Sequence, residues 1–165
     1  MAFINNQSAV FTGAVKLVWD AVSKPETNDD GRKSLSLTLA IPKNAPEVEE
    51  LKKVAEDAIR EKFPTGRPKK FEEYFKDFDE EKYPELAGSH WQFRPNTQKH
   101  IDTYNGKSPI THDEFGRMVY AGAEVKVIVA GKAYVGGDYN KHKHGAGFWL
   151  NGVQIAEHRN SYRPL

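Results

Sequence analysis

The sequence contains no cysteine, so it offers no disulfide framework, no thiolate ligands for zinc and no cysteine nucleophile. Long apolar runs are also lacking, because no segment approaches the roughly 20 apolar residues that a membrane-spanning helix needs. Residues 1–7 carry neither the basic region nor the apolar run of a signal peptide. We therefore expect a soluble, cytoplasmic protein with no membrane partner.

Neither sign of charge is in excess. The 24 lysines and arginines almost balance the 23 aspartates and glutamates, and the net charge is +1, so the molecule as a whole does not attract a polyanion. Acidic residues nevertheless concentrate in 47–85, whereas 90–107, the segment from Lys126 onward and the short tail 159–165 are mostly basic. This uneven distribution predicts a positive surface on one side of the molecule.

The common catalytic signatures are missing as well. The chain has no G-x-x-x-x-G-K-[ST] phosphate loop, no H-E-x-x-H zinc motif and no G-x-S-x-G nucleophile elbow. The glycines of its last third do not lead from a strand into a helix, so we interpret them as turn and bulge residues. We therefore expect no enzymatic activity and no cofactor.

Two strands are indicated in the first quarter of the chain. Residues 10–22 alternate, which predicts a half-buried strand with Leu17 and Trp19 on the same side. Turn-forming residues fill 23–32. Residues 35–41 alternate again, which predicts a second strand, antiparallel to the first.

One amphipathic helix follows. Residues 47–62 place apolar side chains three and four positions apart with charges between them, and Pro64 and Gly66 end the pattern. The next stretch, 67–86, is rich in charge and aromatic residues, and the rings between residues 71 and 78 are spaced like those of a short amphipathic helix. We interpret this stretch as an insertion that packs by its rings.

Three further strands complete the pattern. They are expected at 89–101, bent near Pro95, at 124–134 and at 145–156, with a polar loop between the first two. Five main strands, one amphipathic helix and long loop insertions predict a mainly β, single-domain fold over residues 1–165. An oligonucleotide-binding barrel (OB-fold) fits, because it is a five-stranded, partly open Greek-key barrel.

Aromatic and basic residues gather on the third and last predicted strands and in the turn before the last one. Rings on a sheet stack on bases of any sequence, and lysines and arginines neutralise phosphates. This combination predicts a surface that binds single-stranded nucleic acid. The candidate DNA-binding residues are Trp91, Phe93, Arg94, Lys99, Tyr134, Tyr139, Lys141, Lys143, Phe148 and Trp149.

Strand alternation divides the candidates of the last strand between two faces. It places Trp149 on the face of Val153 and Ile155, and Phe148 on the opposite face. The apolar run makes the Trp149 face the expected core, so Phe148 is the expected stacking residue. We expect the preceding turn, 139–144, to contact phosphates.

Several segments also resemble those of a family of phage single-stranded DNA-binding proteins with an OB-fold, once classed as a domain of unknown function. The resemblance covers most of the chain and is most specific in its first and last strands. It rests on the opening strand Phe11 to Val15, the strand end Ile41 to Lys43, the helix 48–63, the strand 125–134 and the closing Gly147 to Gln154.

The resemblance implies sequence-independent binding and protection of single-stranded DNA in phage replication, recombination or repair, inside the host cytoplasm. It makes single-stranded DNA the expected partner, with phage replication or recombination proteins and a second copy of the chain as further candidates. Two features differ. The helix 47–62 follows the second expected strand, whereas the usual barrel carries its helix between the third and fourth. The sequence ends in the basic stretch 159–165, whereas many replication-type single-strand binders carry an acidic tail that recruits partner enzymes.

Two other functions remain open. His112, Asp113, His142 and His144 are ligand types suited to zinc or manganese, and a metal bound there would make the protein a metal-dependent nucleic-acid hydrolase. Alternatively, the acidic helix and the aromatic stretch 71–78 could bind a protein, as in an interaction or assembly module.

Overall fold

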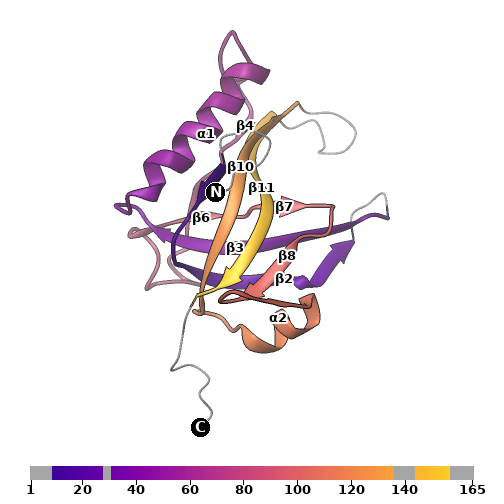
Figure 1. The fold of residues 1–165 in the computed structure, drawn as a ribbon. Coiled ribbons are helices and arrows are strands. Elements are labelled where there is room, and N and C mark those ends of the chain that lie inside the picture. The colour runs from indigo at the N-terminus through magenta and orange to yellow at the C-terminus, as the bar shows by residue number, and fades with distance from the viewer. Residues whose placement is uncertain (1–8, 28–30, 136–143, 157–165) are drawn as a thin grey trace.

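The computed structural model describes residues 9–27, 31–135 and 144–156. Its strands form one sheet in the order β1-β10-β2-β3-β7-β11-β8-β9, with a further pairing between β10 and β11. Because β10 pairs with both β2 and β11, the run β10-β2-β3-β7-β11 closes on itself as a barrel (Figure 1). The barrel strands are Val15–Thr27 (β2), Lys33–Pro42 (β3), Asn96–Thr97 (β7), Glu124–Tyr134 (β10) and His144–Ile155 (β11).

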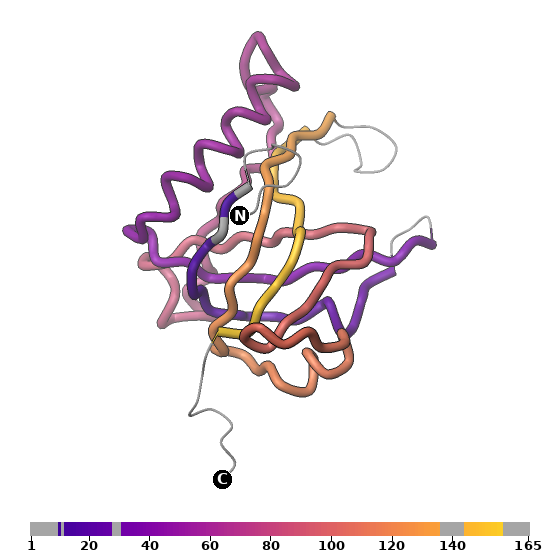
Figure 2. The backbone as a smooth tube through the Cα atoms, in the orientation of Figure 1, coloured from indigo at the N-terminus to yellow at the C-terminus, as the bar shows by residue number. Residues whose placement is uncertain are grey.

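The strand directions are those of an OB-fold. β2 with β3, β3 with β7, and β10 with β11 are antiparallel, whereas β7 and β11 run parallel and complete the ring. Figure 2 shows that the first strands and the last hairpin, from opposite ends of the chain, lie in the same barrel. The predicted mainly β, OB-fold-like barrel is confirmed.

The first predicted strand is divided in two. Gly13 has a φ of 72°, a conformation that glycine adopts without strain, and it separates β1 (Ala9–Phe11) from β2. β1 pairs with β10. The prediction of one continuous strand over 10–22 is therefore wrong at Gly13. β2 also runs on to Thr27, through residues expected to turn.

The amphipathic helix is confirmed as α1, Glu47–Lys62. Its buried face includes Leu51 and Ala55, and it packs against β10 and β1 at one end of the barrel (Figure 1). The contact is close at Gly131 of β10, where an added Cβ would overlap the carbonyl group of Val54. A glycine at this position lets the helix backbone approach the strand.

A second helix, α2 (His112–Met118), replaces part of the predicted polar loop. Thr111 and Glu114 form a capping box: the Thr111 hydroxyl accepts a hydrogen bond from the Glu114 backbone N–H, and the Glu114 carboxylate accepts one from the Thr111 backbone N–H. The sequence pattern T-x-x-E, from Thr111 to Glu114, is typical of a capping box. α2 lies between the third and fourth barrel strands in chain order, where the usual OB barrel has its helix.

The stretch 67–86 forms two short strands and no helix, which corrects the predicted helical spacing. β4 (Phe71–Glu72) pairs with the start of β11, and β5 (Lys76–Asp77) pairs with β6 (His90–Phe93). The backbone of this stretch is thus held by strand pairing with β11 and β6. The expected packing by rings is found, since Phe75 and Phe78 are buried.

The third predicted strand is bent at Pro95, as expected, and becomes β6 and β7. After it come β8 (Asp102–Asn105) and β9 (Ser108–Ile110), a small hairpin that was not predicted. β8 lies parallel to the last part of β11. Of the helices in the described ranges, none is long and apolar enough to cross a membrane.

Candidate nucleic-acid interface

β11 contains a bulge that reverses its side-chain alternation. Ile128 of β10 pairs with Gly152, whereas the next residue, Val129, pairs with Leu150. Asn151 is therefore an extra residue in β11, with no partner of its own in this register. Because of this extra residue, side chains before Asn151 point to the face opposite to the one that strict alternation along β11 predicts.

The predicted faces of β11 are consequently wrong. Phe148 is only 1% exposed and lies in the core together with Val153 and Ile155, whereas Trp149 is 46% exposed. The ring of Phe148 packs against Phe75 and Phe93 at centroid distances of 6.0 and 5.6 Å. Phe148 is a core residue that cannot stack on a base in this structure, and Trp149 is the accessible ring.

A second irregularity exposes Trp19 on β2. Leu17 pairs with Leu39, but Trp19 pairs with the next residue of β3, Thr38, so Val18 is extra. Leu17 is buried and Trp19 is 57% exposed. The prediction that these two side chains share one side is therefore wrong, and the large ring of Trp19 is open to solvent.

Trp19 and Trp149 flank the same outer surface of the barrel. Ser36 pairs with Asn96, and Asn96 pairs with Trp149; paired residues in neighbouring strands lie on one side of a sheet. Trp19 pairs with Thr38, two residues from Ser36 and hence on that same side. Three strand spacings, about 14 Å along the sheet, separate the strands of the two tryptophans. We call this surface, from Trp19 across Thr38, Ser36 and Asn96 to Trp149, the tryptophan face.

Arg94 extends over the tryptophan face. Its Nε atom donates a hydrogen bond to the Ser36 hydroxyl at 3.2 Å, and its Nη2 atom donates to Glu26 Oε1 at 2.5 Å. The side chain is about half exposed, with an exposure of 47%. Lys99 is also exposed, in the turn after β7. Both predicted basic residues therefore lie at the surface, and Arg94 contacts the tryptophan face itself through Ser36.

Lys132 contacts Trp149 directly. Its Nζ atom lies 4.1 Å from the centre of the Trp149 ring and donates a hydrogen bond to Asn96 Oδ1 at 2.6 Å. Burial lowers the pKa of the Lys132 amine from 10.5 to about 8, because a partly desolvated ammonium is less stable than one in water. A negatively charged phosphate beside the ammonium group would replace the interactions with water that burial removes.

Two predicted residues of β6 are engaged inside the protein instead. Phe93 is only 2% exposed and belongs to the core, which corrects its assignment as an accessible stacking residue. Trp91 is half-buried; its ring stacks on Phe75 at 5.5 Å, and Lys43 Nζ lies 4.4 Å from its centre. Lys43 also pairs with Asp77 at 2.7 Å. Trp91 thus helps to fix the insertion to the barrel.

Tyr134 lies near the far end of the β10–β11 hairpin. Tyr134 pairs with Gly145 and is half-buried, and burial raises its pKa. A Cβ added to Gly145 would collide with the Tyr134 ring, so the ring covers this glycine. Tyr139, Lys141 and Lys143 lie outside the described residues, and their contacts with phosphates stay predictions.

The residues of the predicted metal site lie apart. His112 begins α2, where its Nε2 atom is 2.7 Å from the Ile101 carbonyl oxygen, and Asp113 pairs with Arg117. His144 is at the start of β11, at the end of the barrel near α1, with its ring against Phe63. Within the described ranges, no group of three or more histidine, aspartate or glutamate side chains is placed to hold a metal ion. His142 lies outside those ranges.

Sequence reasoning missed two members of the site. Trp19 could not be found from alternation, because the bulge at Val18 depends on pairing with β3. Lys132 could have been found from the sequence. It lies an even number of residues from Lys126, and buried valines occupy alternate positions between them, so both lysines face the outer side.

Solved structures of phage proteins are similar to this chain in fold. The single-stranded DNA-binding protein of bacteriophage Enc34 in complex with single-stranded DNA is 17% identical, with a TM-score of 0.72, and the match covers 96% of this chain and 94% of that one. A C-terminal truncation of the Enc34 protein is 16% identical, with a TM-score of 0.70, and the match covers 92% of this chain and 86% of that one. The single-stranded DNA-binding protein gp2.5 of bacteriophage T7 is 16% identical, with a TM-score of 0.58, and the match covers 95% of this chain and 96% of that one.

No protein-family model and no curated protein sequence matches the chain. At these low identities the likeness establishes the fold, a barrel shared over nearly the whole chain with phage single-stranded DNA-binding proteins, the class that the sequence resemblance indicated.

Proposed function

We propose that this protein binds single-stranded DNA without regard to sequence and protects it during phage DNA replication, recombination or repair. The observation that carries the proposal is the tryptophan face: two exposed tryptophan rings, Trp19 and Trp149, flank one outer surface of an OB-fold barrel. Lys132 lies over the Trp149 ring, and Arg94 bonds to Ser36 of the same face. A solved protein of similar fold is a phage protein in complex with single-stranded DNA, which supports the same function here.

The two rings would act as stacking platforms. Stacking of a base on an aromatic side chain contributes about 1–3 kcal/mol and tolerates every base, because each base has a π-face. The surface between the rings carries the small side chain of Thr38, whereas Ser36 is only 2% exposed and its hydroxyl accepts a hydrogen bond from Arg94. Single strands can place their bases on such rings, whereas a duplex keeps its bases stacked on each other.

Phosphates would be bound by Arg94 and Lys132. Both are held in place by neutral partners as well, Arg94 by the Ser36 hydroxyl and Lys132 by the Asn96 amide oxygen, so their positions are defined before DNA arrives. Contacts of this kind carry no sequence information and weaken as salt concentration rises. The protein is proposed to act in the host cytoplasm as a non-enzymatic, single-domain binding module.

Fluorescence titration tests the proposal. A single-stranded oligonucleotide should quench the fluorescence of the exposed tryptophans, and added salt should relieve the quenching, with a slope of log K against log salt of about −0.7 per phosphate contact. A duplex of the same length serves as the control and should bind more weakly. Equal or tighter binding to the duplex, or no binding to any single strand at low salt, would reject the function.

A further inference from the structure

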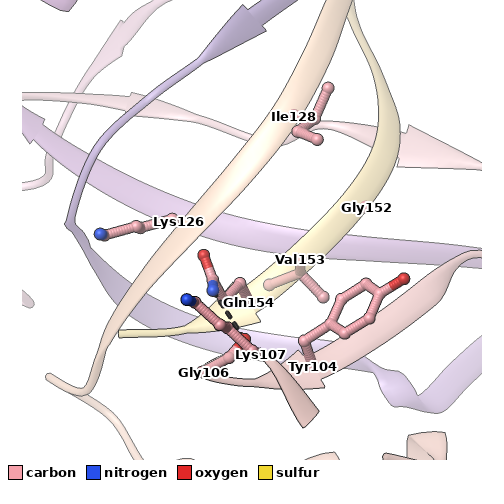
Figure 3. A pocket seen from close by; sticks show the side chains of 8 residues that line it. All are labelled: Tyr104, Gly106, Lys107, Lys126, Ile128, Gly152, Val153 and Gln154. Carbon is pink, nitrogen blue, oxygen red and sulfur yellow. Dashed lines mark hydrogen bonds between the residues drawn. The ribbon is translucent and has the colours of Figure 1, made fainter. Parts of the chain in front are cut away.

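A pocket opens on the outer side of the barrel beyond the tryptophan face. It has a volume of about 320 Å³ and lies where the β8–β9 hairpin meets β10 and β11. Figure 3 shows Tyr104 on one side of the pocket and Lys126 on the other, with Gln154 between them. The lining residues are Tyr104, Gly106, Lys107, Lys126, Ile128 and, from β11, Gly152, Val153 and Gln154.

The walls of the pocket combine three kinds of chemistry. Tyr104 supplies an aromatic ring, and Ile128 supplies an apolar surface. Val153 is only 2% exposed, and its side chain belongs to the core. Gln154 donates a hydrogen bond from Nε2 to the Gly106 carbonyl oxygen at 2.6 Å, which fixes the amide and leaves Oε1 as the acceptor that it presents (Figure 3). Lys107 places an exposed amine at the rim.

This combination fits a nucleotide unit. A base needs a flat apolar or aromatic surface and a polar group at its edge, and its phosphate needs a cation nearby. An amide oxygen can accept a hydrogen bond from any of the four bases, since each carries at least one N–H group. The pocket therefore matches a nucleobase without selecting strongly among sequences.

The pocket also lies on the path of a strand bound at the tryptophan face. Ala130 pairs with Trp149, and Ile128, at the next outward position of β10, pairs with Gly152 of the pocket. Outward positions of one strand are about 7 Å apart. Tyr104 pairs with Gln154, so its side chain lies on the same side of the sheet. A strand that stacks on Trp149 and continues along β10 meets the pocket next.

We propose that this pocket binds one base of the DNA strand, with the ring against Tyr104 and Ile128 and the adjoining phosphate near Lys107. The inference rests on the proposed function and adds to it a discrete base-binding site in an interface that otherwise stacks bases on open rings.

Methyl NMR tests this directly. In protein labelled at the isoleucine δ1 methyl groups, a thymidine oligonucleotide of about 12 residues should shift the Ile128 signal upfield by the ring current of the base. The buried Ile41 methyl should remain unshifted, and Ile128→Val identifies the signal. A base-free strand with the same sugar phosphates is the control, and tryptophan fluorescence reports overall binding in the same samples.

The outcomes separate the two proposals. Tryptophan quenching with no movement of the Ile128 signal overturns the pocket and leaves single-stranded DNA binding intact. An equal Ile128 shift with the base-free strand also overturns it, because the occupant is then a phosphate. If neither reporter responds and no strand binds, both proposals fail. A shift that requires bases supports the pocket.

Variants give an independent measurement. Tyr104→Leu should weaken binding of the thymidine strand about fivefold or more, and Tyr104→Phe, which keeps the ring, should restore it. Lys107→Gln should lower affinity and the salt dependence together, whereas Lys82→Gln, an exposed lysine of the insertion, should change neither. Thermal unfolding checks that each variant is folded. Equal affinity of Tyr104→Leu and the natural protein would overturn the assignment.

Discussion

The Nζ atom of Lys132 lies 4.1 Å from the centre of the Trp149 ring. The two residues occupy diagonal positions on β10 and β11, where Lys132 pairs with Gly147 and Trp149 with Ala130. The amine therefore occupies space above one face of the ring in the free protein. A base that stacks on that face must displace it, and the displaced amine is then close to the phosphates of the same strand.

Replacement of Lys132 by methionine should make DNA binding insensitive to pH near 8. The natural amine has a pKa of about 8, so it loses its charge as pH rises through that value and its attraction to phosphate is lost. Binding constants measured from about pH 7 to 9 should fall for the natural protein and stay flatter for Lys132→Met. The same pH dependence in both proteins would show that another group is responsible.

The same substitution should stabilise the free protein at neutral pH. Folding lowers the pKa of this amine from 10.5 to about 8, so the unfolded state binds more protons between those values and the stability of the natural protein rises with pH there. Lys132→Met removes the buried charge, and its advantage, on the order of 1 kcal/mol for a partly exposed group, should be full below pH 8 and vanish toward pH 10.5. Thermal unfolding of both proteins across this range measures it.

Neighbouring substitutions on β11 should have opposite effects. Trp149→Leu should weaken single-stranded DNA binding by about 1–3 kcal/mol and leave the unfolding temperature nearly unchanged, because the ring is exposed. Phe148→Leu should lower the stability by about 1–3 kcal/mol through lost core contacts and leave affinity nearly unchanged below its unfolding temperature. If Phe148→Leu alone impaired binding, the face assignment would be refuted.

Trp19 should contribute as a second platform. Trp19→Ala is expected to weaken binding of a long single strand by about 1–3 kcal/mol, and to have less effect on an oligonucleotide too short to span the roughly 14 Å between the strands of the two tryptophans. Affinities of a length series, measured for both proteins, check this. A loss that is independent of length would place Trp19 outside the path.

The close packing of α1 on β10 should depend on Gly131. Gly131→Ala puts a methyl group against the backbone of Val54 and should cost about 1–3 kcal/mol of stability, since a strand and a helix must separate. Gly147→Ala is the matched control: its added Cβ would lie 3.7 Å from Lys132 Cε, an ordinary contact, and the change should stay within about 0.5 kcal/mol. Denaturant unfolding of both variants gives the comparison.

Local patterns were enough for the elements whose structure is local. The spacing of apolar residues in 47–62 predicted α1 to the residue, because a helix forms its hydrogen bonds within itself. The strands at 124–134 and 145–156 were predicted within a residue at each end, although the side-chain alternation of the second is interrupted at Asn151. The rings between residues 71 and 78 were spaced like those of a short helix, and the backbone there instead pairs with β11 and β6.

The sequence by itself determined the amount of apolar and aromatic side chain, the strands and helix that could bury it, and the barrel class that results. The tertiary structure alone decided which rings face solvent. Trp19 and Trp149 are exposed because β2 and β11 each take one extra residue against the preceding or following strand. The position of that extra residue is set by strand pairing, and a shift of one residue turns a side chain to the other face. The pocket likewise needs β8 and β11 side by side, a parallel pairing that local alternation does not encode.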